Sequence, residues 1–230
     1  MHLPQLIQGR LLGRPNRFTA QVALEEESPV LAHCPNTGSM LGCSLPGQTV
    51  CLSRANNPKR KLSYTWEMIQ MPSSWVGVNT MLANRIVLEA LQNKMIQELA
   101  SYSKIRQEVK TAANSRIDFL LQGNRLQQCY LEVKSCTWVR EQTASFPDAP
   151  TLRGQKHLAL LRDLQAQGFN TAILYLIQRQ DAKTFSPAQD IDPRYALLLQ
   201  EARKAGTKVL AYDVQFDSQE ISLHKRIPLG

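Results

Sequence analysis

The chain has 230 residues, of which 43% are hydrophobic and 20% are charged, and this composition excludes disorder as its main state. Its 27 Lys and Arg outnumber its 19 Asp and Glu, so the net charge of +8 favours a polyanionic partner. The first residues lack the apolar core of a signal peptide, and nowhere do about eighteen apolar residues follow one another. We therefore expect a soluble cytoplasmic protein that binds no membrane.

The cysteines argue against an extracellular or zinc-binding protein. They number five, which is odd, and no two of them form a CxxC pair. A disulfide framework or a zinc knuckle is therefore not indicated, and we expect reduced thiols in a cytoplasm.

The first eighty residues contain short strand-like segments that are separated by turn sequences. These segments are 5–14, 17–26, 28–34, 48–55 and 61–71. Such strands without a helix predict a small barrel or sandwich. Over 79–102 the pattern changes to helical spacing, with Leu88, Leu91, Met95 and Leu99 in register. We therefore place one domain at 1–80 and a second at 81–230.

The second domain is predicted to alternate between helices and strands. Strands are expected at 104–110, 116–121, 129–136, 169–179 and 208–216, and a last extended segment at 221–229. A helix follows Thr151 as its N-cap and stops at Gly168, and another begins at Pro193. The order helix, three strands, helix, strand predicts an α/β (α+β) domain.

Two of these strands carry charges in otherwise apolar runs. Asp118 lies in RIDFLL, while Glu132 and Lys134 lie in CYLEVKSC. Because side chains alternate along a strand, Glu132 and Lys134 share one face. If the loop is 123–125, residue 130 pairs with Asp118, which is then a diagonal neighbour of Glu132 on that face. A loop of two or four residues would turn Asp118 away unless a bulge intervened.

A divalent cation would resolve the repulsion between the two acids. Mg²⁺ typically uses one or two protein carboxylates and completes its coordination with waters and a substrate phosphate. Lys134 would point at the same site and could orient a water or stabilise charge on the phosphate. The alternative is that the E-x-K tripeptide is a local ion pair on a solvated strand, worth about 0–1 kcal/mol.

The arrangement helix, three strands, helix, strand with D…ExK resembles the PD-(D/E)xK nuclease superfamily, which includes restriction endonucleases. The literal proline is absent, because Ile117 precedes Asp118. The resemblance implies a mixed central sheet, a site of Asp118, Glu132 and Lys134, and a further acid on the first helix. Glu89 matches that position, and Glu108 is a weaker candidate because nothing fixes its face.

A closer resemblance covers nearly the whole chain. The segments HCPNTGSM, NPKRKLSYTWE, VNTMLANR, SRIDFLL, LEVKSCT and FPDAPTLRGQKHL resemble the bacterial sugar fermentation stimulation protein family, SfsA. That resemblance implies an N-terminal OB fold joined to a restriction-endonuclease-like domain. It also implies non-sequence-specific DNA binding linked to the regulation of sugar (maltose) metabolism.

Basic and aromatic residues of the first domain could bind nucleic acid. Cations follow a phosphate backbone and aromatic faces stack on bases, as on OB-fold surfaces. The candidates are Arg10, Arg14, Arg17, Lys59, Arg60, Lys61, Tyr64 and Trp66. The alternative is a solvated turn beside core aromatics, and burial of the Tyr64 and Trp66 face would remove the stacking argument. Near the start of the second long helix, Lys156 and His157 are further candidates, although either could be structural.

We expect a two-domain protein that binds DNA or RNA and has a metal site of Asp118, Glu132 and Glu89 for Mg²⁺ or Mn²⁺. Two functions remain open, an active Mg²⁺-dependent nuclease and a regulatory DNA-binding protein without hydrolysis. Both a monomer and a homodimer are compatible with the sequence.

Overall fold

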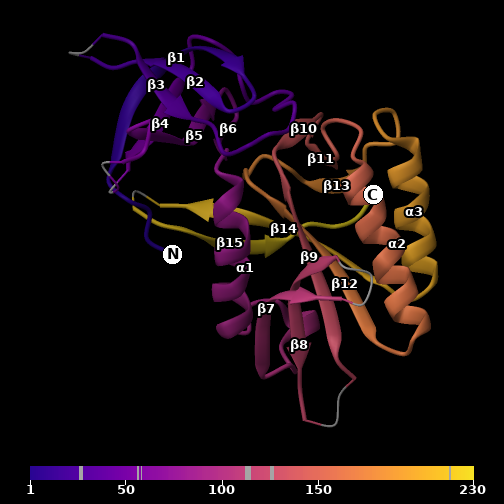
Figure 1. Ribbon diagram of the computed structural model, residues 1–230. Helices are drawn as coiled ribbons and strands as arrows, with labels where there is room; N and C mark the ends of the chain where they lie inside the picture. Colours follow the sequence, from indigo (N-terminus) through magenta and orange to yellow (C-terminus); the bar gives the residue numbers. More distant parts are fainter. Residues whose placement is uncertain (26–27, 56, 58, 112–114, 125–126, 218) are drawn as a thin grey trace.

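The computed structural model describes residues 1–25, 28–55, 57, 59–111, 115–124, 127–217 and 219–230 (Figure 1). An N-terminal barrel lies at one end of the molecule, and a sheet flanked by helices forms the remainder (Figure 1). No helix among these residues is long and apolar enough to span a membrane.

The barrel is formed by the first six strands. They are β1 (Leu6–Asn16), β2 (Thr19–Ala23), β3 (Val30–His33), β4 (Thr49–Arg54), β5 (Tyr64–Met71) and β6 (Ser74–Gly77). Their order is β3-β2-β1-β4-β5-β6, and a parallel pairing of β3 with β5 closes the sheet on itself. Closure removes the free edges that an open sheet would expose. The predicted OB-fold-like barrel is confirmed.

A mixed six-stranded sheet organises the second domain. Its strands are β7 (Lys104–Lys110), β8 (Arg116–Gln122), β9 (Cys129–Cys136), β12 (Asn170–Ile177), β14 (Lys208–Phe216) and β15 (Ile221–Arg226). In the order β15-β14-β12-β9-β8-β7, the three central strands β14, β12 and β9 are parallel and the outer pairings are antiparallel. The mixed restriction-endonuclease-like sheet that the resemblance implied is therefore confirmed.

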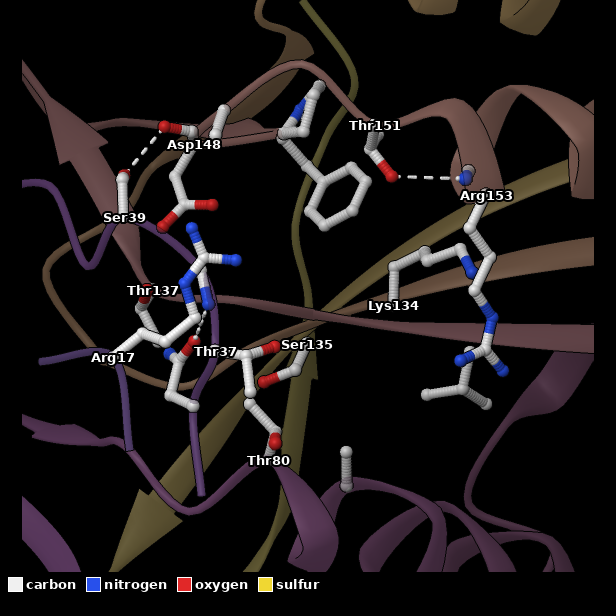
Figure 2. Close-up of a pocket in the computed structure, with 18 of the residues that line it drawn as sticks. Arg17, Thr37, Ser39, Thr80, Lys134, Ser135, Thr137, Asp148, Thr151 and Arg153 are labelled. Atoms are coloured by element: carbon white, nitrogen blue, oxygen red, sulfur yellow. Dashed lines mark hydrogen bonds between the residues drawn. The ribbon is translucent and has the colours of Figure 1, made fainter. Parts of the chain in front are cut away.

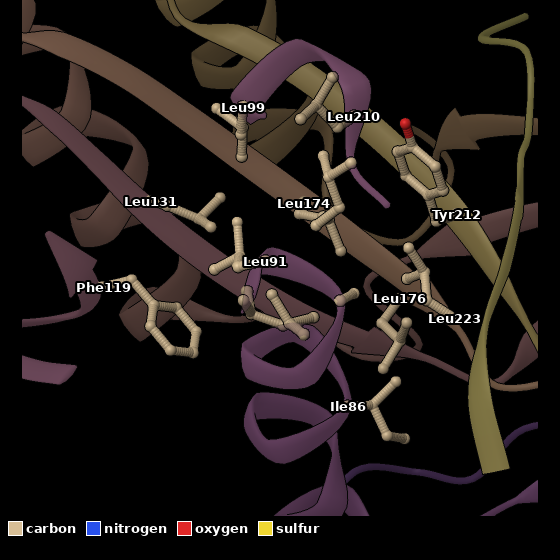
Figure 3. Close-up of a cluster of buried hydrophobic side chains, with 14 of the residues drawn as sticks. Ile86, Leu91, Leu99, Phe119, Leu131, Leu174, Leu176, Leu210, Tyr212 and Leu223 are labelled. Carbon is tan, nitrogen blue, oxygen red and sulfur yellow. The ribbon is translucent and has the colours of Figure 1, made fainter. Parts of the chain in front are cut away.

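Helices cover both faces of this sheet. The helix α1 (Ala83–Gln92) lies on one face, and α2 (Leu152–Ala166) and α3 (Pro193–Lys204) lie together on the other (Figure 1). Figure 3 shows Leu91 of α1 beside Leu131 and Leu174 of the central strands, and Ile86 nearer to Leu176. Because the central strands are buried on both faces, their sequences are almost continuously apolar. A charge on such a strand therefore needs a specific explanation.

The first helix is shorter than its spacing predicted. It ends at Gln92, with Asn93 as its C-cap and Lys94 in the left-handed region at φ 56°. Short 3₁₀ turns, Thr80–Leu82 and Gln97–Leu99, precede and follow it. A small sheet of β10 (Trp138–Arg140), β11 (Thr143–Phe146) and β13 (Thr184–Pro187) was not predicted. The N-cap role of Thr151 is confirmed, since its hydroxyl accepts the Gly154 amide.

Several hydrogen bonds hold the barrel against the second domain. The amide of Met40 donates to Oδ2 of Asp148 over 2.8 Å, and the amide of Gly77 donates to the carbonyl of Gln178 over 2.8 Å. The amide of Leu3 donates to the carbonyl of Gln219 over 2.8 Å. The first residues of the chain therefore lie on the second domain before the chain enters the barrel at β1.

Candidate metal centre and nucleic-acid cavity

A cavity of about 950 Å³ lies between the barrel and the second domain. The 14–17 and 36–39 segments of the barrel line it on one side, and α1, β8, β9 and the 145–154 segment line it on the other. Asp118, Glu132 and Lys134 all line this cavity. The residues predicted to form a site are thus brought together where the two domains meet.

The β8–β9 register differs from the predicted one. Phe119 pairs with Leu131, and continuing that register places Asp118 opposite Glu132 rather than opposite residue 130. The loop prediction included Arg125, which lies outside the described residues. The shift is an even number of residues, so the two acids stay on one face.

Asp118 is held by one hydrogen bond on each carboxylate oxygen. Oδ1 accepts from Nδ2 of Asn84 over 2.9 Å, and Oδ2 accepts from the Val133 amide over 2.8 Å. Burial, followed by the negative charge of Glu132, raises the pKa of Asp118 above its ordinary value. A cation between the two acids would remove part of that penalty.

Glu132 lies at the floor of the cavity with a side chain that is 2% exposed. Its Oε1 contacts both Nζ of Lys134 and Nδ1 of His157, and Lys134 Nζ lies 3.3 Å from that ring nitrogen. Burial alone would raise the pKa of Glu132, but the His157 hydrogen bond and the Lys134 charge hold it below its ordinary value. The carboxylate is therefore ionised at neutral pH.

The donor set fits a hard divalent cation. Oε2 of Glu132 is buried and has no hydrogen-bond partner in the described part of the chain, so one carboxylate oxygen is unsatisfied. Asp118, on the neighbouring strand, supplies the second carboxylate. Among the described residues, no three His, Cys, Asp or Glu side chains cluster as a complete metal site. Two carboxylates with room for water and phosphate oxygens are what Mg²⁺ commonly uses.

The structure does not bring Glu89 to this site. Its carboxylate contacts the N-terminal amine of Met1, with a distance of 2.9 Å to Oε2. Asn84, five residues earlier on α1, takes the place that was predicted for Glu89. Its side chain points about 140° away from that of Glu89 around the helix axis. Glu108 lies outside the cavity as well, half-exposed and 3.9 Å from Arg116. Nothing in the helical spacing alone distinguished Asn84 from Glu89.

Two arginines at the cavity have no internal partner. Arg17 and Arg153 line it from opposite domains, and neither side chain makes a hydrogen bond or ion pair with any described residue. In Figure 2 they lie on opposite sides of the view, with Lys134 nearer to Arg153. Arg14 also lines the cavity, but its guanidinium donates to the carbonyl oxygens of Arg17, Asn36, Gly38 and Ser39. It therefore supports the neighbouring turn rather than being free for a ligand.

Two family models match the chain in succession. The SfsA N-terminal OB domain matches residues 12–78, and the sugar fermentation stimulation protein RE domain matches residues 81–220. The chain belongs to the SfsA family. Two sugar fermentation stimulation protein homologs illustrate how complete the similarity is. The one from Pelobacter propionicus is 47% identical and covers 100% of this chain and 99% of its own, and the one from Geobacter sulfurreducens is 46% identical over 100% and 98%.

A solved structure of another SfsA protein has the same fold. Pyrococcus furiosus SfsA, determined in complex with Ca²⁺, superposes with a TM-score of 0.91 at 25% sequence identity. The match covers 100% of this chain and 98% of that one. Both domains and their mutual arrangement are therefore shared across distant SfsA relatives.

The predicted aromatic platform on β5 is not available. Trp66 is fully buried and Tyr64 is 7% exposed, and both belong to the barrel core with Leu52 and Ile69. The indole Nε1 of Trp66 donates to the Met68 carbonyl over 2.9 Å. Packing inside a small closed barrel, rather than exposure on its surface, explains these aromatics.

The remaining basic candidates lie outside the cavity. Lys59, Lys61 and Lys156 are exposed, and Arg10 donates to the carbonyl of Gly47 over 2.8 Å. Arg60 donates to Oγ1 of Thr65 over 3.2 Å. His157, by contrast, is buried against Glu132, so it contacts an acid of the candidate centre rather than the protein surface.

Sequence reasoning missed the contact that fixes the cavity wall. Asp148 accepts the Met40 amide, and its backbone carbonyl accepts the Ser39 hydroxyl over 2.6 Å. A Cβ added at Gly38 would lie 2.9 Å from both carboxylate oxygens of Asp148, so glycine is needed for this close approach. The two segments that make this contact, PNTG and FPDAP, can be seen in the sequence, but only the fold shows that they lie against each other.

Proposed function

We propose that the chain binds nucleic acid in the cavity between its domains and cleaves phosphodiester bonds with Mg²⁺ or Mn²⁺. The observation that carries this proposal is the convergence of Asp118, Glu132 and Lys134 on the floor of one cavity, with the unsatisfied Oε2 of Glu132 among them. Asp118 and Glu132 would hold the ion. Bound there, a divalent ion would polarise the phosphodiester and lower the pKa of an attacking water.

Each protein group then has a defined role. The Glu132 carboxylate is kept ionised by Lys134 and His157, so it can bind a cation at neutral pH. The Lys134 ammonium, fixed by Glu132, can donate to a water or to a phosphate oxygen. Arg17 and Arg153 would neutralise phosphates on either side of the bond that is cleaved.

A second candidate is DNA binding that regulates sugar metabolism without cleavage. It is favoured by the internal neutralisation of the centre, because Lys134 and His157 both contact Oε1 of Glu132 and balance its charge without a metal. The sugar fermentation stimulation names of the relatives agree with a regulatory role. In that case Arg17 and Arg153 would contribute to the affinity for DNA and not to cleavage.

The proposal includes a cytoplasmic location. All five cysteines are free and buried, as expected where thiols stay reduced. Nucleic acid is also the polyanion that a basic protein of this net charge would meet there.

The test compares cleavage of labelled oligonucleotides by the wild type and three variants. Single-stranded and duplex DNA and RNA are incubated with MgCl₂, MnCl₂ or EDTA. Asp118→Ala and Lys134→Ala should lose activity by at least about 100-fold, as for removal of a charge-stabilising group. Glu89→Ala is the matched control, because its carboxylate lies outside the cavity, and should cleave as the wild type does.

The result also separates the two candidates. Cleavage that needs the divalent ion and both cavity residues supports the nuclease. Salt-dependent binding without cleavage by any form would leave the regulator. Binding that does not weaken with salt would contradict both, because phosphate contacts release counterions.

A further inference from the structure

Of the three most exposed large hydrophobic side chains of the described chain, one lines the cavity and the other two belong to residues next in the chain to lining residues. The three are Leu152, Met81 and Phe18, which are 75%, 71% and 54% exposed. Met81 lines the cavity, Leu152 lies between the lining residues Thr151 and Arg153, and Phe18 directly follows the lining residue Arg17. Exposed apolar residues at or next to the lining of a polar cavity need a reason, because single exposed hydrophobics are otherwise scattered.

Phe18 is held in position by its turn. Asn16 pairs with Thr19 at the end of the β1–β2 hairpin, and the Phe18 amide donates to Oδ1 of Asn16 over 2.9 Å. Among the described residues, Phe18 is the one aromatic in the set of exposed large hydrophobics. Phe18 follows the free Arg17 in the chain, and an aromatic with a neighbouring cation is the combination on which unpaired bases stack while the cation takes the phosphate.

The size of the cavity favours one strand over two. Its volume of about 950 Å³ is that of a site for small molecules or a short piece of one strand. The contacts of Met40 and Ser39 with Asp148 join the two walls directly, so the cavity could widen there only if these hydrogen bonds broke.

We propose that the cavity takes single-stranded nucleic acid. The bases stack on Phe18 and contact Met81 and Leu152, and the backbone follows Arg17 and Arg153 towards the acids on the cavity floor. In a duplex the bases are already stacked inside the helix and cannot reach these side chains. This inference rests on the proposed function and deepens it by naming the kind of nucleic acid that the cavity binds. Binding of a single strand does not need the metal centre, whereas its cleavage does.

The experiment measures binding by fluorescence anisotropy in EDTA. The probes are a labelled 12-residue oligonucleotide of mixed sequence as DNA, as RNA and as each annealed duplex. We expect either single strand to bind at least about tenfold more tightly than its duplex. Phe18→Ala should weaken single-strand binding about tenfold, as one lost base stack would, and leave duplex binding unchanged.

Matched variants separate stacking from general surface effects. Phe18→Trp should keep the affinity, because it keeps an aromatic face. Leu45→Ala removes a side chain of the barrel that is 53% exposed, and neither Leu45 nor its neighbours in the chain line the cavity, so it should bind as the wild type does. Comparing DNA with RNA identifies which strand is preferred.

Each outcome decides the inference. The inference is overturned if a duplex binds as tightly as its single strand, or if Phe18→Ala leaves single-strand binding unchanged, even where single strand and duplex are both cleaved. Either result would assign the apolar side chains to a protein partner. Single-strand preference without cleavage in MgCl₂ or MnCl₂ supports it while the nuclease proposal fails. Absence of binding to any probe overturns both.

Discussion

The interior of this protein and the edge of its cavity contain the same kinds of side chain in opposite states. Trp66 is fully buried and the side chain of Lys134 is 13% exposed, and each has a partner inside the protein. Phe18 and Arg17 are exposed, and the side chain of Arg17 has no partner among the described residues. The difference teaches that an aromatic or a cation serves stability where packing and hydrogen bonds already engage it. Where they do not, it is free to bind a ligand.

The largest effect should separate the two aromatics. Trp66→Ala removes a fully buried side chain from the barrel core and should cost about 3–5 kcal/mol of unfolding free energy. Phe18→Ala should change it by less than about 0.5 kcal/mol, because the side chain is exposed. Urea denaturation measures both. Equal losses in the two variants would remove the distinction between interior and edge.

A somewhat smaller loss is expected for Lys134, the cation paired with the buried Glu132. The side chain of Glu132 is 2% exposed, and Lys134→Met leaves it with His157 as its remaining partner among the described residues. The substitution should therefore cost about 3 kcal/mol of unfolding free energy. Glu132→Gln combined with Lys134→Met should recover much of this, since no buried charge is left uncompensated. Urea denaturation of the single and double variants checks it, and a single variant as stable as the wild type would contradict the buried pairing.

The effect of divalent ions should depend on Asp118. Folding raises the pKa of Asp118, so the unfolded chain loses this proton at a lower pH than the folded protein does. Stability therefore falls as the pH rises from near 3.8 to the folded pKa, and this loss persists at higher pH. Asp118→Asn should therefore be more stable than the wild type at pH 7 in EDTA, since an amide can keep both hydrogen bonds once Asn84 turns its own amide.

The same pair of proteins tests the metal. MnCl₂ at about 100 times its dissociation constant should stabilise the wild type by about 2.7 kcal/mol and leave Asp118→Asn unchanged. Thermal unfolding with and without MnCl₂ is the measurement. Equal stabilisation of both proteins would place the ion elsewhere.

The smallest effect is expected for the arginines at the cavity. Arg17→Ala and Arg153→Ala should leave stability unchanged and should each lower the slope of log affinity against log salt by about 0.7 for a single strand. Lys59→Ala is the comparison, because it is also exposed but lies outside the cavity. Anisotropy titrations between 50 and 200 mM salt, a range of about fourfold, measure the slopes. An equal change for Lys59→Ala would indicate a general electrostatic effect.

Much of the fold could be predicted from the sequence, because local rules act over a few residues. The strand over residues 129–136 and the N-cap at Thr151 were predicted where the structure has them. Alternation placed Glu132 and Lys134 on one face, and an even register shift kept Asp118 with them. The first helix ended early at Gln92, because the spacing that continued to Leu99 spans a turn with Lys94 at positive φ.

Only the tertiary structure decided which faces of the strands and helices stayed exposed to solvent. Periodicity states which side chains share a face, but exposure depends on what packs there from elsewhere in the chain. The closed barrel buried Trp66, the N-terminal amine of Met1 engaged Glu89, and the contact of Met40 with Asp148 made the wall of a cavity. The sequence by itself therefore determined the acids and the lysine of the candidate centre. The long-range packing of two domains, which no local pattern encodes, decided that Arg17 and Arg153 line the same cavity.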